Sequence, residues 1–332
     1  MKAMVLAAGL GLRMRPLTLL RAKPALPVLN RPLLRWTLER LARHGVTDVI
    51  INLHHLPETV RAAVGDGGEL GLRVTWSRER TILGTGGGPR AVRDFFGHDP
   101  FLLVNGDMLF DFDLARLFAR HRAMGARATL ALLPNPDPRR YGPVVTGSDG
   151  LVRSLLGRPH RARGAVSLFT GVHVLDPALL ERLPRGASDS VRDLYVPLVA
   201  EGARILGVRV RGAWYDLGRP SLYLSAQIRR LRGGGSLVHP AARIEAGARV
   251  RTSVVGAGAR VAAGAVVESS VLWEGAAVEA GARVRGSILL TGATIGTGQR
   301  ADDRVVLSRR VLPRGARVAG ERRGDAIWSE VG

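Results

Sequence analysis

Residues 3–24 read AMVLAAGLGLRMRPLTLLRAKP, and this stretch decides how the first part of the chain folds. The apolar run Ala3–Ala8 is typical of a buried β-strand, and it leads directly into Gly9 and Gly11. Glycines at these positions let backbone N–H groups approach an anion closely. The stretch therefore predicts a strand followed by a phosphate-binding loop, with Ala8, Gly9 and Gly11 against the phosphates.

The spacing of the loop separates it from two other kinds of phosphate loop. The pattern GxGxR differs from the GxGxxG of dinucleotide-binding folds, and no GKS or GKT follows, as a P-loop requires. Arg13 offers a fork that matches two phosphate oxygens, whereas Lys23 offers a compact positive charge. Lys2 and Lys23 are the only lysines among 49 basic residues, so we expect the ammonium group of Lys23 to be chemically required.

From Met1 to about Arg232, apolar strand-like runs alternate with amphipathic helical segments. The expected strands are Ala3–Ala8, Val49–Leu53, Val74–Trp76, Phe101–Val104 and Ala128–Leu133. The expected first helix is Pro32–His44, with leucines at helical spacing and Gly45 at its end. This alternation predicts an α/β domain over residues 1–232 with a Rossmann-like, mainly parallel sheet, and with ligands beyond the carboxyl ends of the strands.

After a glycine-rich segment at 233–236, a predicted hinge, the chain repeats with a period of 17 residues. The units are 238–254, 255–271, 272–288 and 289–305, followed by a looser unit at 306–322. Aliphatic side chains recur at the first, seventh and thirteenth places, as in Val255, Val261 and Val267. Stacked triangular coils would bury these side chains in one core. We therefore expect about five coils over 237–322, which resemble the left-handed parallel β-helix of hexapeptide-repeat proteins, and a tail over 323–332.

The composition limits the location and the partners. The 332 residues include no cysteine, which excludes disulfides and thiolate zinc sites, and no apolar run approaches the ~20 residues of a membrane span. The start of the chain runs straight into a strand, so we expect a cytoplasmic protein without a membrane partner. The net charge of +21 invites a nucleic-acid interpretation, but the arginines are scattered along the chain. We expect a solvated basic surface and no nucleic-acid partner.

The pattern GxGxRxRPLT followed by Lys23-Pro24 is the signature of the sugar-1-phosphate nucleotidyltransferase family, which the chain resembles along nearly its whole length. With its β-helix, it is similar to the mannose-1-phosphate guanylyltransferase branch. The resemblance implies transfer of a nucleotidyl group from a nucleoside triphosphate to a sugar 1-phosphate. It also implies that Gly11 and Arg13 hold the β- and γ-phosphates, and that Lys23 lies near the α-phosphate.

A second glycine-rich stretch, Leu83–Gly88, opens a helical segment that is expected to run to about Phe96. Taken alone, it also fits a flexible loop. In the family the matching LGTxG segment lies over the nucleotide base, which implies that Gly84, Thr85 and Gly86 contact the nucleotide. We expect nearby polar groups such as Glu79 to read the base.

Two aspartates are candidates for a metal site. Asp107 follows the apolar run Phe101–Val104, and Asp216 lies in a segment that resembles the family's WxDxG motif. Each could alone be a turn or cap residue, but a pair of carboxylates facing a triphosphate suits Mg²⁺, which prefers oxygen ligands. We therefore expect Arg13, Lys23, Asp107 and Asp216 to be catalytic. Asp111 and Asp113 are expected to form a turn and a helix start instead.

The segments expected to bind the sugar 1-phosphate match the family's motifs less completely. Tyr141-Gly142 and Thr170-Gly171 resemble family segments that line the sugar-phosphate pocket. Where the family commonly has Glu-Lys-Pro, this chain has Gly157-Arg158-Pro159. Arg158 can bind a phosphate, but Gly157 offers no acceptor for a sugar hydroxyl. The identity of the sugar therefore stays open.

Several functions remain in competition at this point. GTP with mannose 1-phosphate is the first expectation, followed by UTP or dTTP with glucose 1-phosphate or a related sugar. A non-catalytic regulatory or scaffold subunit of the same family is the alternative of another class. The β-helix could also belong to an acyltransferase, but His239 is its only histidine. We expect the β-helix to form a homo-oligomer instead.

Overall fold

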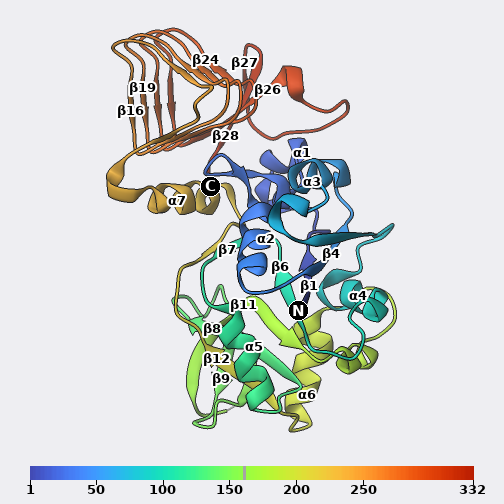
Figure 1. Ribbon diagram of the computed structural model, residues 1–332. Helices are drawn as coiled ribbons and strands as arrows, with labels where there is room; N and C mark the ends of the chain where they lie inside the picture. The colour runs from blue at the N-terminus through green and yellow to red at the C-terminus, as the bar shows by residue number, and fades with distance from the viewer. Residues whose placement is uncertain (160–161) are drawn as a thin grey trace. The chain divides into compact units, whose positions relative to one another are not determined.

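The computed structural model describes residues 1–159 and 162–332 (Figure 1). These residues fold into two compact units. The first contains residues 1–9 and 34–214, and the second contains residues 10–33 and 215–332. The chain therefore passes between the units three times, after Gly9, Leu33 and Trp214. The domain limits expected from the sequence at 232 and 236 stay a prediction.

A mixed β-sheet forms the centre of the first unit. Its parallel part has the order β6-β1-β4-β5, and antiparallel β11 pairs with β6. Strands β9 and β10 extend the sheet beside β11, and β8 and β12 pair with each other along another edge of β11. The strands of this sheet are β1 (Lys2–Leu6), β4 (Asp48–Leu53), β5 (Arg73–Arg78), β6 (Phe101–Asn105), β8 (Ala128–Pro134), β9 (Pro143–Thr146), β10 (Val152–Leu155), β11 (Ala165–Leu175) and β12 (Ile205–Arg209), while β7 (Met108–Phe110) lies outside it.

All five strands expected from the sequence are present, as is the first helix. Strand β4 is buried along almost its whole length because a central parallel strand is covered on both faces. In α2, Leu34, Leu38 and Leu41 are fully buried, as their helical spacing predicted. The helices of this part are α2 (Leu33–Arg43), α3 (Pro57–Val64), α4 (Gly84–Ala91), α5 (Leu114–Ala123) and α6 (Val196–Ala200), with a π-helical turn at Ser190–Tyr195.

A buried polar pair lies within the core of the first unit. The hydroxyl of Tyr195 and Nδ1 of His173 are 2.5 Å apart, and both side chains are almost fully buried. Burial lowers the pKa of His173 to about 3 and raises that of Tyr195, so both groups stay neutral near pH 7.

The second unit is dominated by three parallel sheets that stack as a β-helix, seen as the orange coils in Figure 1. Each strand pairs with the strand 17 residues further on, as in Val238 with Val255 and Ile244 with Val261. The three sheets contain β14 (Leu237–Val238), β17 (Val254–Val255), β20 (Val271–Leu272), β23 (Ile288–Leu289) and β26 (Arg304–Ser308); β15 (Arg243–Ile244), β18 (Arg260–Val261), β21 (Ala277–Val278) and β24 (Thr294–Ile295); and β16 (Arg249–Arg251), β19 (Val266–Glu268), β22 (Arg283–Arg285) and β25 (Arg300–Asp302).

The inward positions expected from the repeat form one hydrophobic core. Val255, Val261 and Val267 are fully buried, and the matching residues of the next two units lie in the same cluster. In the first coil, Val238 and Ile244 remain 37% exposed because a terminal coil has a neighbour on one side only. The residues that precede the β-helix form α1 (Leu17–Leu20), a short β2–β3 hairpin (Pro27–Val28 and Arg31–Pro32), β13 (Trp214–Asp216) and α7 (Pro220–Arg230).

The fifth unit departs from the coil that we expected. Residues 304–308 add β26 to the stack, but the chain then forms a hairpin of β27 (Glu321–Arg323) and β28 (Ala326–Glu330). Strand β28 runs antiparallel to β26, so residues 326–330 are part of the sheet and not a tail. The buried Trp328 packs against the core and closes this end of the coil.

A serine ladder runs along one corner of the β-helix. Ser236, Ser253, Ser270 and Ser287 recur at the 17-residue period. The backbone N–H of Ser270 donates to Oγ of Ser253, and that of Ser287 donates to Oγ of Ser270, both over 3.1 Å. The hydroxyls of the last three serines each donate to a carbonyl of their own coil, for example Ser270 to Glu268 over 2.6 Å. The ladder thereby satisfies buried backbone donors where the chain turns.

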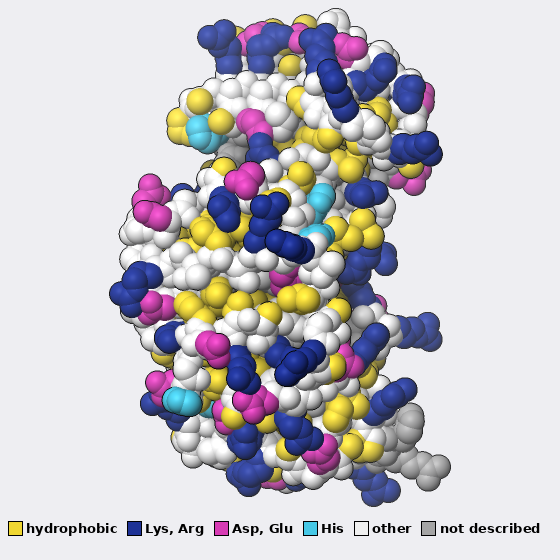
Figure 2. Space-filling model, turned by 90° about the vertical axis from the view of Figure 1, so that its right-hand side faces the viewer, with side chains coloured by type: hydrophobic (Ala, Val, Ile, Leu, Met, Phe, Trp, Pro, Cys, Tyr) yellow, Lys and Arg dark blue, Asp and Glu magenta, His cyan; other side chains and the backbone are white. Residues whose placement is uncertain are grey.

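Charged side chains are spread widely over the surface. On the face drawn in Figure 2, lysine and arginine side chains are interspersed with acidic ones. Across the two described segments of the chain, no helix is both long and apolar enough to cross a membrane.

Replacing Ser270 by alanine is expected to lower the free energy of unfolding by about 1–3 kcal/mol, because it leaves the buried N–H of Ser287 without an acceptor. Urea unfolding followed by circular dichroism measures the change. Thr297→Ala, at an exposed turn of the same β-helix, is the control and should change stability by less than about 0.5 kcal/mol. Equal effects of the two substitutions would contradict the role of the ladder.

The buried His173 is expected to make the first unit less stable in acid. Its pKa is about 3 in the folded protein and 6.5 ordinarily, so between these values the unfolded chain binds the extra proton. The free energy of unfolding keeps its full contribution from this histidine above about pH 6.5, and it loses that contribution as the pH falls towards 3. Between pH 7 and pH 5 the loss should be about 2 kcal/mol.

His173→Gln should therefore reduce the pH dependence of urea unfolding by about that amount. The exposed His98 provides the control, because His98→Gln should keep the pH dependence of the parent. A His173→Gln variant with an unchanged pH dependence would contradict the assignment.

Candidate active site

Three of the residues predicted to bind phosphate or metal, Ala8, Gly9 and Asp107, follow neighbouring strand ends of the first unit. At the carboxyl end of β1, Leu6 lies beside Asn105 of β6 and Asn52 of β4. The N–H of Gly106 donates to the carbonyl of Leu6 over 2.9 Å. The segment with Ala8 and Gly9 and the segment with Asp107 therefore leave the sheet from adjacent strands.

A buried polar network holds these strand ends. The N–H of Ala7 donates to Oδ1 of Asn52 over 2.7 Å, and Nδ2 of Asn52 donates to Oε1 of Glu79 over 2.8 Å. The second oxygen of Glu79 accepts from the N–H of Leu83 over 2.9 Å. Glu79 therefore holds the starts of both glycine-rich segments in place, a structural role separate from the contact with the nucleotide base that we expected of it. Sequence reasoning missed Asn52, whose signal was a polar side chain near the end of an apolar strand.

The glycines of the second stretch are required by packing. The helix α4 begins at Gly84, and the N–H groups of Gly86 and Gly87 donate to the carbonyl of Ser188 over 2.8 and 3.4 Å. A Cβ on Gly87 would lie 2.1 Å from the carbonyl oxygen of Gly186. Nothing in the sequence pairs these distant segments, so this reason for the glycines could not be predicted.

Thr85 takes part in the same packing. Its Oγ1 accepts from the N–H of Ser190 over 2.9 Å, at the start of the π-helical turn. The hydroxyl of Ser188 is buried, has no hydrogen-bond partner, and lies where a Cβ on Gly86 would approach within 2.8 Å. Contact of Gly84, Thr85 and Gly86 with a nucleotide stays a prediction.

On the sugar side, the structure brings together residues from three segments. The ring of Tyr141 meets that of Trp214 edge-on, with 5.4 Å between centroids, and Nε1 of Trp214 donates to the carbonyl of Thr170 over 3.0 Å. Gly171 has φ +82°, and a Cβ there would lie 2.6 Å from Nδ2 of Asn105. The hydroxyl of Thr170 donates to the carbonyl of Ala131 over 2.9 Å, so it serves the fold.

Arg158 lies on a tight turn beside Gly142. Leu155 and Arg158 exchange two backbone hydrogen bonds of 2.9 Å, and the N–H of Leu156 donates to the carbonyl of Pro143. A Cβ on Gly142 would lie 2.2 Å from Leu156, so only glycine permits this approach. The turn leaves the side chain of Arg158 exposed.

Within the second unit, the signature loop folds back on itself. Oγ1 of Thr18 donates to the carbonyl of Gly11 over 2.8 Å, and Gly11 has φ +62°. A Cβ on Gly11 would lie 2.8 Å from Thr18 and 3.5 Å from Cβ of Lys23, so the loop brings Gly11 and Lys23 together. Lys23 is buried, whereas Arg13 is exposed.

Of the four aspartates discussed for the sequence, Asp111 and Asp113 make hydrogen bonds that define their structural roles. Oδ1 of Asp111 accepts from the N–H of Ala213 over 2.5 Å, and Asp113 caps α5 by accepting from Arg116 over 2.9 Å. Asp113 is therefore a helix-start residue, as expected, whereas Asp111 bonds to a distant segment and does not form the local turn that the sequence predicted. Asp107 and Asp216 are half-buried, and their role as metal ligands stays a prediction. Among the described residues, no cluster of three or more histidine or acidic side chains is arranged to hold a metal.

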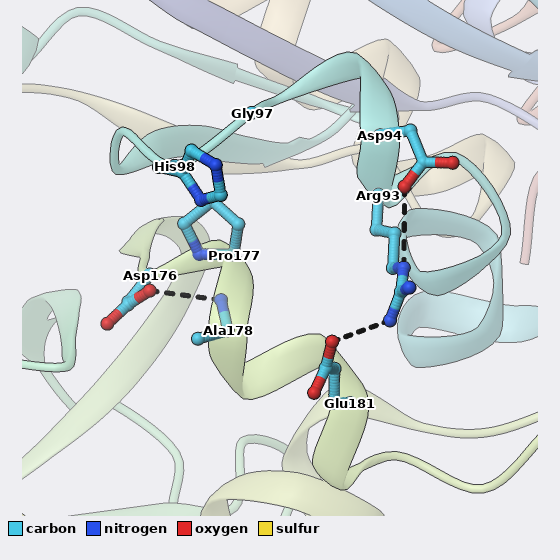
Figure 3. A pocket seen from close by; sticks show the side chains of 8 residues that line it. All are labelled: Arg93, Asp94, Gly97, His98, Asp176, Pro177, Ala178 and Glu181. Carbon is cyan, nitrogen blue, oxygen red and sulfur yellow. Dashed lines mark hydrogen bonds and ion pairs between the residues drawn. The ribbon is translucent and has the colours of Figure 1, made fainter.

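A surface pocket of about 370 Å³ lies elsewhere in the first unit (Figure 3). Arg93, at its rim, forms ion pairs with Glu181 over 2.7 Å and with Asp94 over 3.4 Å. Its lining also includes His98 and Asp176, but none of the residues predicted to bind substrates. Its lining has three acidic groups and one arginine, an excess of negative charge that does not suit a polyanionic substrate, so we do not assign this pocket to the active site.

Comparison with known proteins agrees with the signature. Residues 2–232 match the family described as nucleotidyl transferase, and residues 233–318 match the GMPPB C-terminal domain. The mannose-1-phosphate guanylyltransferase of Mycobacterium tuberculosis is 34% identical over 74% of this chain and 72% of its own length. The UTP–glucose-1-phosphate uridylyltransferase of Synechocystis is 32% identical over 72% of this chain and 68% of its own length.

A solved structure shows the same fold. It is a Bacillus anthracis protein assigned as a glucose-1-phosphate thymidylyltransferase, crystallised with sucrose. The TM-score is 0.57 at 21% identity, and the match covers 65% of this chain and 89% of the other. The family match over residues 2–232, together with the two relatives above 30% identity, assigns the chain. It belongs to the sugar-1-phosphate nucleotidyltransferases of the nucleotidyl transferase family, the enzymes that join a nucleoside triphosphate and a sugar 1-phosphate into an NDP-sugar.

Proposed function

We propose that this enzyme makes GDP-mannose and pyrophosphate from GTP and mannose 1-phosphate. The observation that carries the proposal is the combination of a nucleotidyl transferase match at 2–232 with a GMPPB C-terminal match at 233–318. Several relatives with guanylyltransferase names support it, including one from M. tuberculosis. The Synechocystis relative keeps UTP with glucose 1-phosphate as the second candidate.

In the proposed reaction, a phosphate oxygen of the sugar 1-phosphate attacks the α-phosphorus of the nucleoside triphosphate. A new P–O bond forms as the bond between the α-phosphorus and the bridging oxygen breaks, and that electron pair leaves with pyrophosphate. The nucleophile is already an anion, so no general base is needed. The enzyme's task is to align two polyanions and to offset their charge.

Residues of the signature loop supply charge in this proposal. Backbone N–H groups at Gly9 and Gly11 hold phosphate oxygens, and Arg13 takes the charge that develops on pyrophosphate. Lys23 stabilises the α-phosphate as substitution occurs. The burial of Lys23 supports this role, because an ammonium group with little water around it interacts more strongly with an anion.

Enzymes of this family generally use a divalent metal ion, and Mg²⁺ is the ion that we propose here. Asp107 and Asp216 would hold it, and their carboxylate oxygens are the ligands that Mg²⁺ prefers. When bound, the ion offsets phosphate charge in the transition state. Replacement of either aspartate by asparagine keeps the shape of the side chain and removes one ligand charge.

The second glycine-rich stretch would bind the nucleotide base, and a further group of residues would bind the sugar 1-phosphate. Gly84, Thr85 and Gly86 would pack against the nucleotide base, held in place by the Glu79–Asn52 network. Arg158 would bind the phosphate of the sugar substrate, and Tyr141, Gly142, Thr170 and Gly171 would line its pocket. We further propose a cytoplasmic enzyme, where its triphosphate substrate is made, that forms a homo-oligomer through the β-helix.

The substrate assignment is tested by pyrophosphate release from GTP, ATP, UTP, CTP and dTTP, each with mannose 1-phosphate or glucose 1-phosphate. GTP with mannose 1-phosphate should give a kcat/KM at least about tenfold above any other pair. A preference for UTP or dTTP with glucose 1-phosphate would overturn the GDP-mannose proposal. Release from no pair, by protein that is folded by circular dichroism, would contradict nucleotidyl transfer.

Asp107→Asn and Asp216→Asn should each lower kcat by about 10²–10³-fold while the protein stays folded. Steady-state kinetics and thermal unfolding measure the two effects. Asp113→Asn is the matched control, because asparagine caps a helix as well as aspartate does, and it should keep parental activity. Full turnover by either of the first two variants would remove that residue from the proposed metal site.

A further inference from the structure

The signature loop belongs to the same compact unit as the β-helix, although the sequence places it with the nucleotidyl transferase part. We propose that Trp273 and Glu274, in the third coil, are positioning residues for nucleotidyl transfer, because they hold the backbone that carries Lys23. This inference rests on the proposed role of Lys23 at the α-phosphate. Its support is a set of contacts on both sides of Lys23, all within the second unit.

The first contact is ionic and lies two residues before Lys23. Arg21 forms a hydrogen-bonded ion pair with Oε1 of Glu274, and Oγ1 of Thr291 donates to the same oxygen over 2.5 Å. The guanidinium of Arg21 also lies 5.4 Å from the ring centroid of Trp273. Both charged side chains are about two-thirds buried, so water screens the pair less than an exposed one. Arg21 is therefore held by two consecutive residues of one coil.

The second contact passes through buried aromatic groups and lies four residues after Lys23. Nε1 of Trp273 donates to the hydroxyl of Tyr223 over 3.0 Å, and that hydroxyl donates to the carbonyl of Pro27. Trp273 and Tyr223 are almost completely buried. Burial raises the pKa of Tyr223, so its hydroxyl keeps the proton that it donates to the loop.

Two further hydrogen bonds fix the end of the loop. Nδ2 of Asn30 donates to the carbonyl of Val255 over 2.9 Å, and the N–H of Leu29 donates to Oε1 of the buried Gln227 over 2.9 Å. Leu29 and Asn30 have φ +51° and +60°, a conformation that few non-glycine residues adopt without such support. The loop is thus held at Arg21, Pro27, Leu29 and Asn30.

The repeat itself marks these contacts as exceptional. The places equivalent to Trp273 in neighbouring units are His239, Gly256 and Leu290, and those equivalent to Glu274 are Pro240, Ala257 and Thr291. Neither place belongs to the core cluster of the coils, so the stacked core does not require tryptophan or glutamate there. The β-helix departs from its own pattern where it touches the loop, which points to selection for that contact.

Positioning matters because the reaction needs Lys23 at a defined distance from the α-phosphate. A displacement of about 1 Å in an active site can lower the rate by as much as about 10²-fold. Loosening Arg21 frees the segment that precedes Lys23 without changing Lys23 itself. The expected result is a lower kcat with little change in the KM for the sugar 1-phosphate.

The test compares Glu274→Gln with Glu279→Gln. Glu279 is the matched control, since it pairs with Arg260 between coils over 2.5 Å, is similarly exposed, and is not bonded to the loop. Hydrogen–deuterium exchange should rise at the amides of Ala25 and Leu26 in Glu274→Gln and stay at the parental level in Glu279→Gln. This readout does not depend on which reaction the enzyme catalyses.

Kinetics with the best substrate pair form the second arm. Glu274→Gln should lower kcat by about tenfold and leave the KM for the sugar 1-phosphate within about twofold, with melting temperatures alike in both variants. The double variant Arg21→Glu with Glu274→Arg should recover part of the kcat that either single reversal loses. Trp273→Phe, which keeps an aromatic ring but loses the donor to Tyr223, should show a smaller decrease in kcat.

The outcomes separate this inference from the proposed function. Unchanged exchange at residues 25 and 26 in Glu274→Gln, or parental kcat in both Glu274→Gln and Trp273→Phe, would overturn the positioning role. Raised exchange in a protein whose parent releases no pyrophosphate from any substrate pair would keep the structural contact and reject the proposed function. Equal losses of kcat in Glu274→Gln and Glu279→Gln would mean a general effect on the β-helix and would also overturn the inference.

Discussion

The buried carboxyl group of Glu79 sets the constraint on which the first unit depends. A carboxyl group without water needs hydrogen-bond partners, and here they come from Asn52 at the end of β4 and from the N–H of Leu83 before α4. Asn52 in turn accepts from Ala7 after β1. Three segments that are distant in sequence therefore meet in one network, and both glycine-rich segments start from it. The start of each is held in place by the fold, which would lower the entropy cost of the proposed nucleotide binding.

The β-helix meets a different requirement. Its interior needs only small aliphatic residues at fixed intervals, and a serine ladder at one corner supplies acceptors for buried N–H groups. The second and third places of each repeat unit are not part of this core cluster. Trp273 and Glu274 occupy such positions and bind the signature loop, while the closing hairpin with Trp328 covers the last coil. The β-helix thus contributes a hydrophobic core, a closing hairpin at its last coil and the side chains that bind the signature loop.

In the proposed reaction, the supports of the signature loop matter because they would place positive charge near the phosphates. A reaction between two polyanions whose nucleophile is already ionised gains most from placing positive charge accurately. The chain carries an excess of arginine, yet it retains a lysine at position 23, where the side chain is buried. A compact ammonium group in such a place acts over a short range, so its effect depends on where the backbone is held.

The sequence by itself determined the parts that repeat or alternate. Strand runs, the spacing of leucines in α2 and the 17-residue period each report which side chains are buried, so five strands, one helix and the β-helix core could be predicted, and the signature identified the family. Tertiary structure alone decided which isolated polar residues meet. Asn52, Ser188 and Glu274 recur at no period, and their partners lie 17 to 253 residues away along the chain, beyond any local pattern. It also decided that residues 10–33 pack with the β-helix and that residues 326–330 form a strand, because both depend on contacts between distant segments.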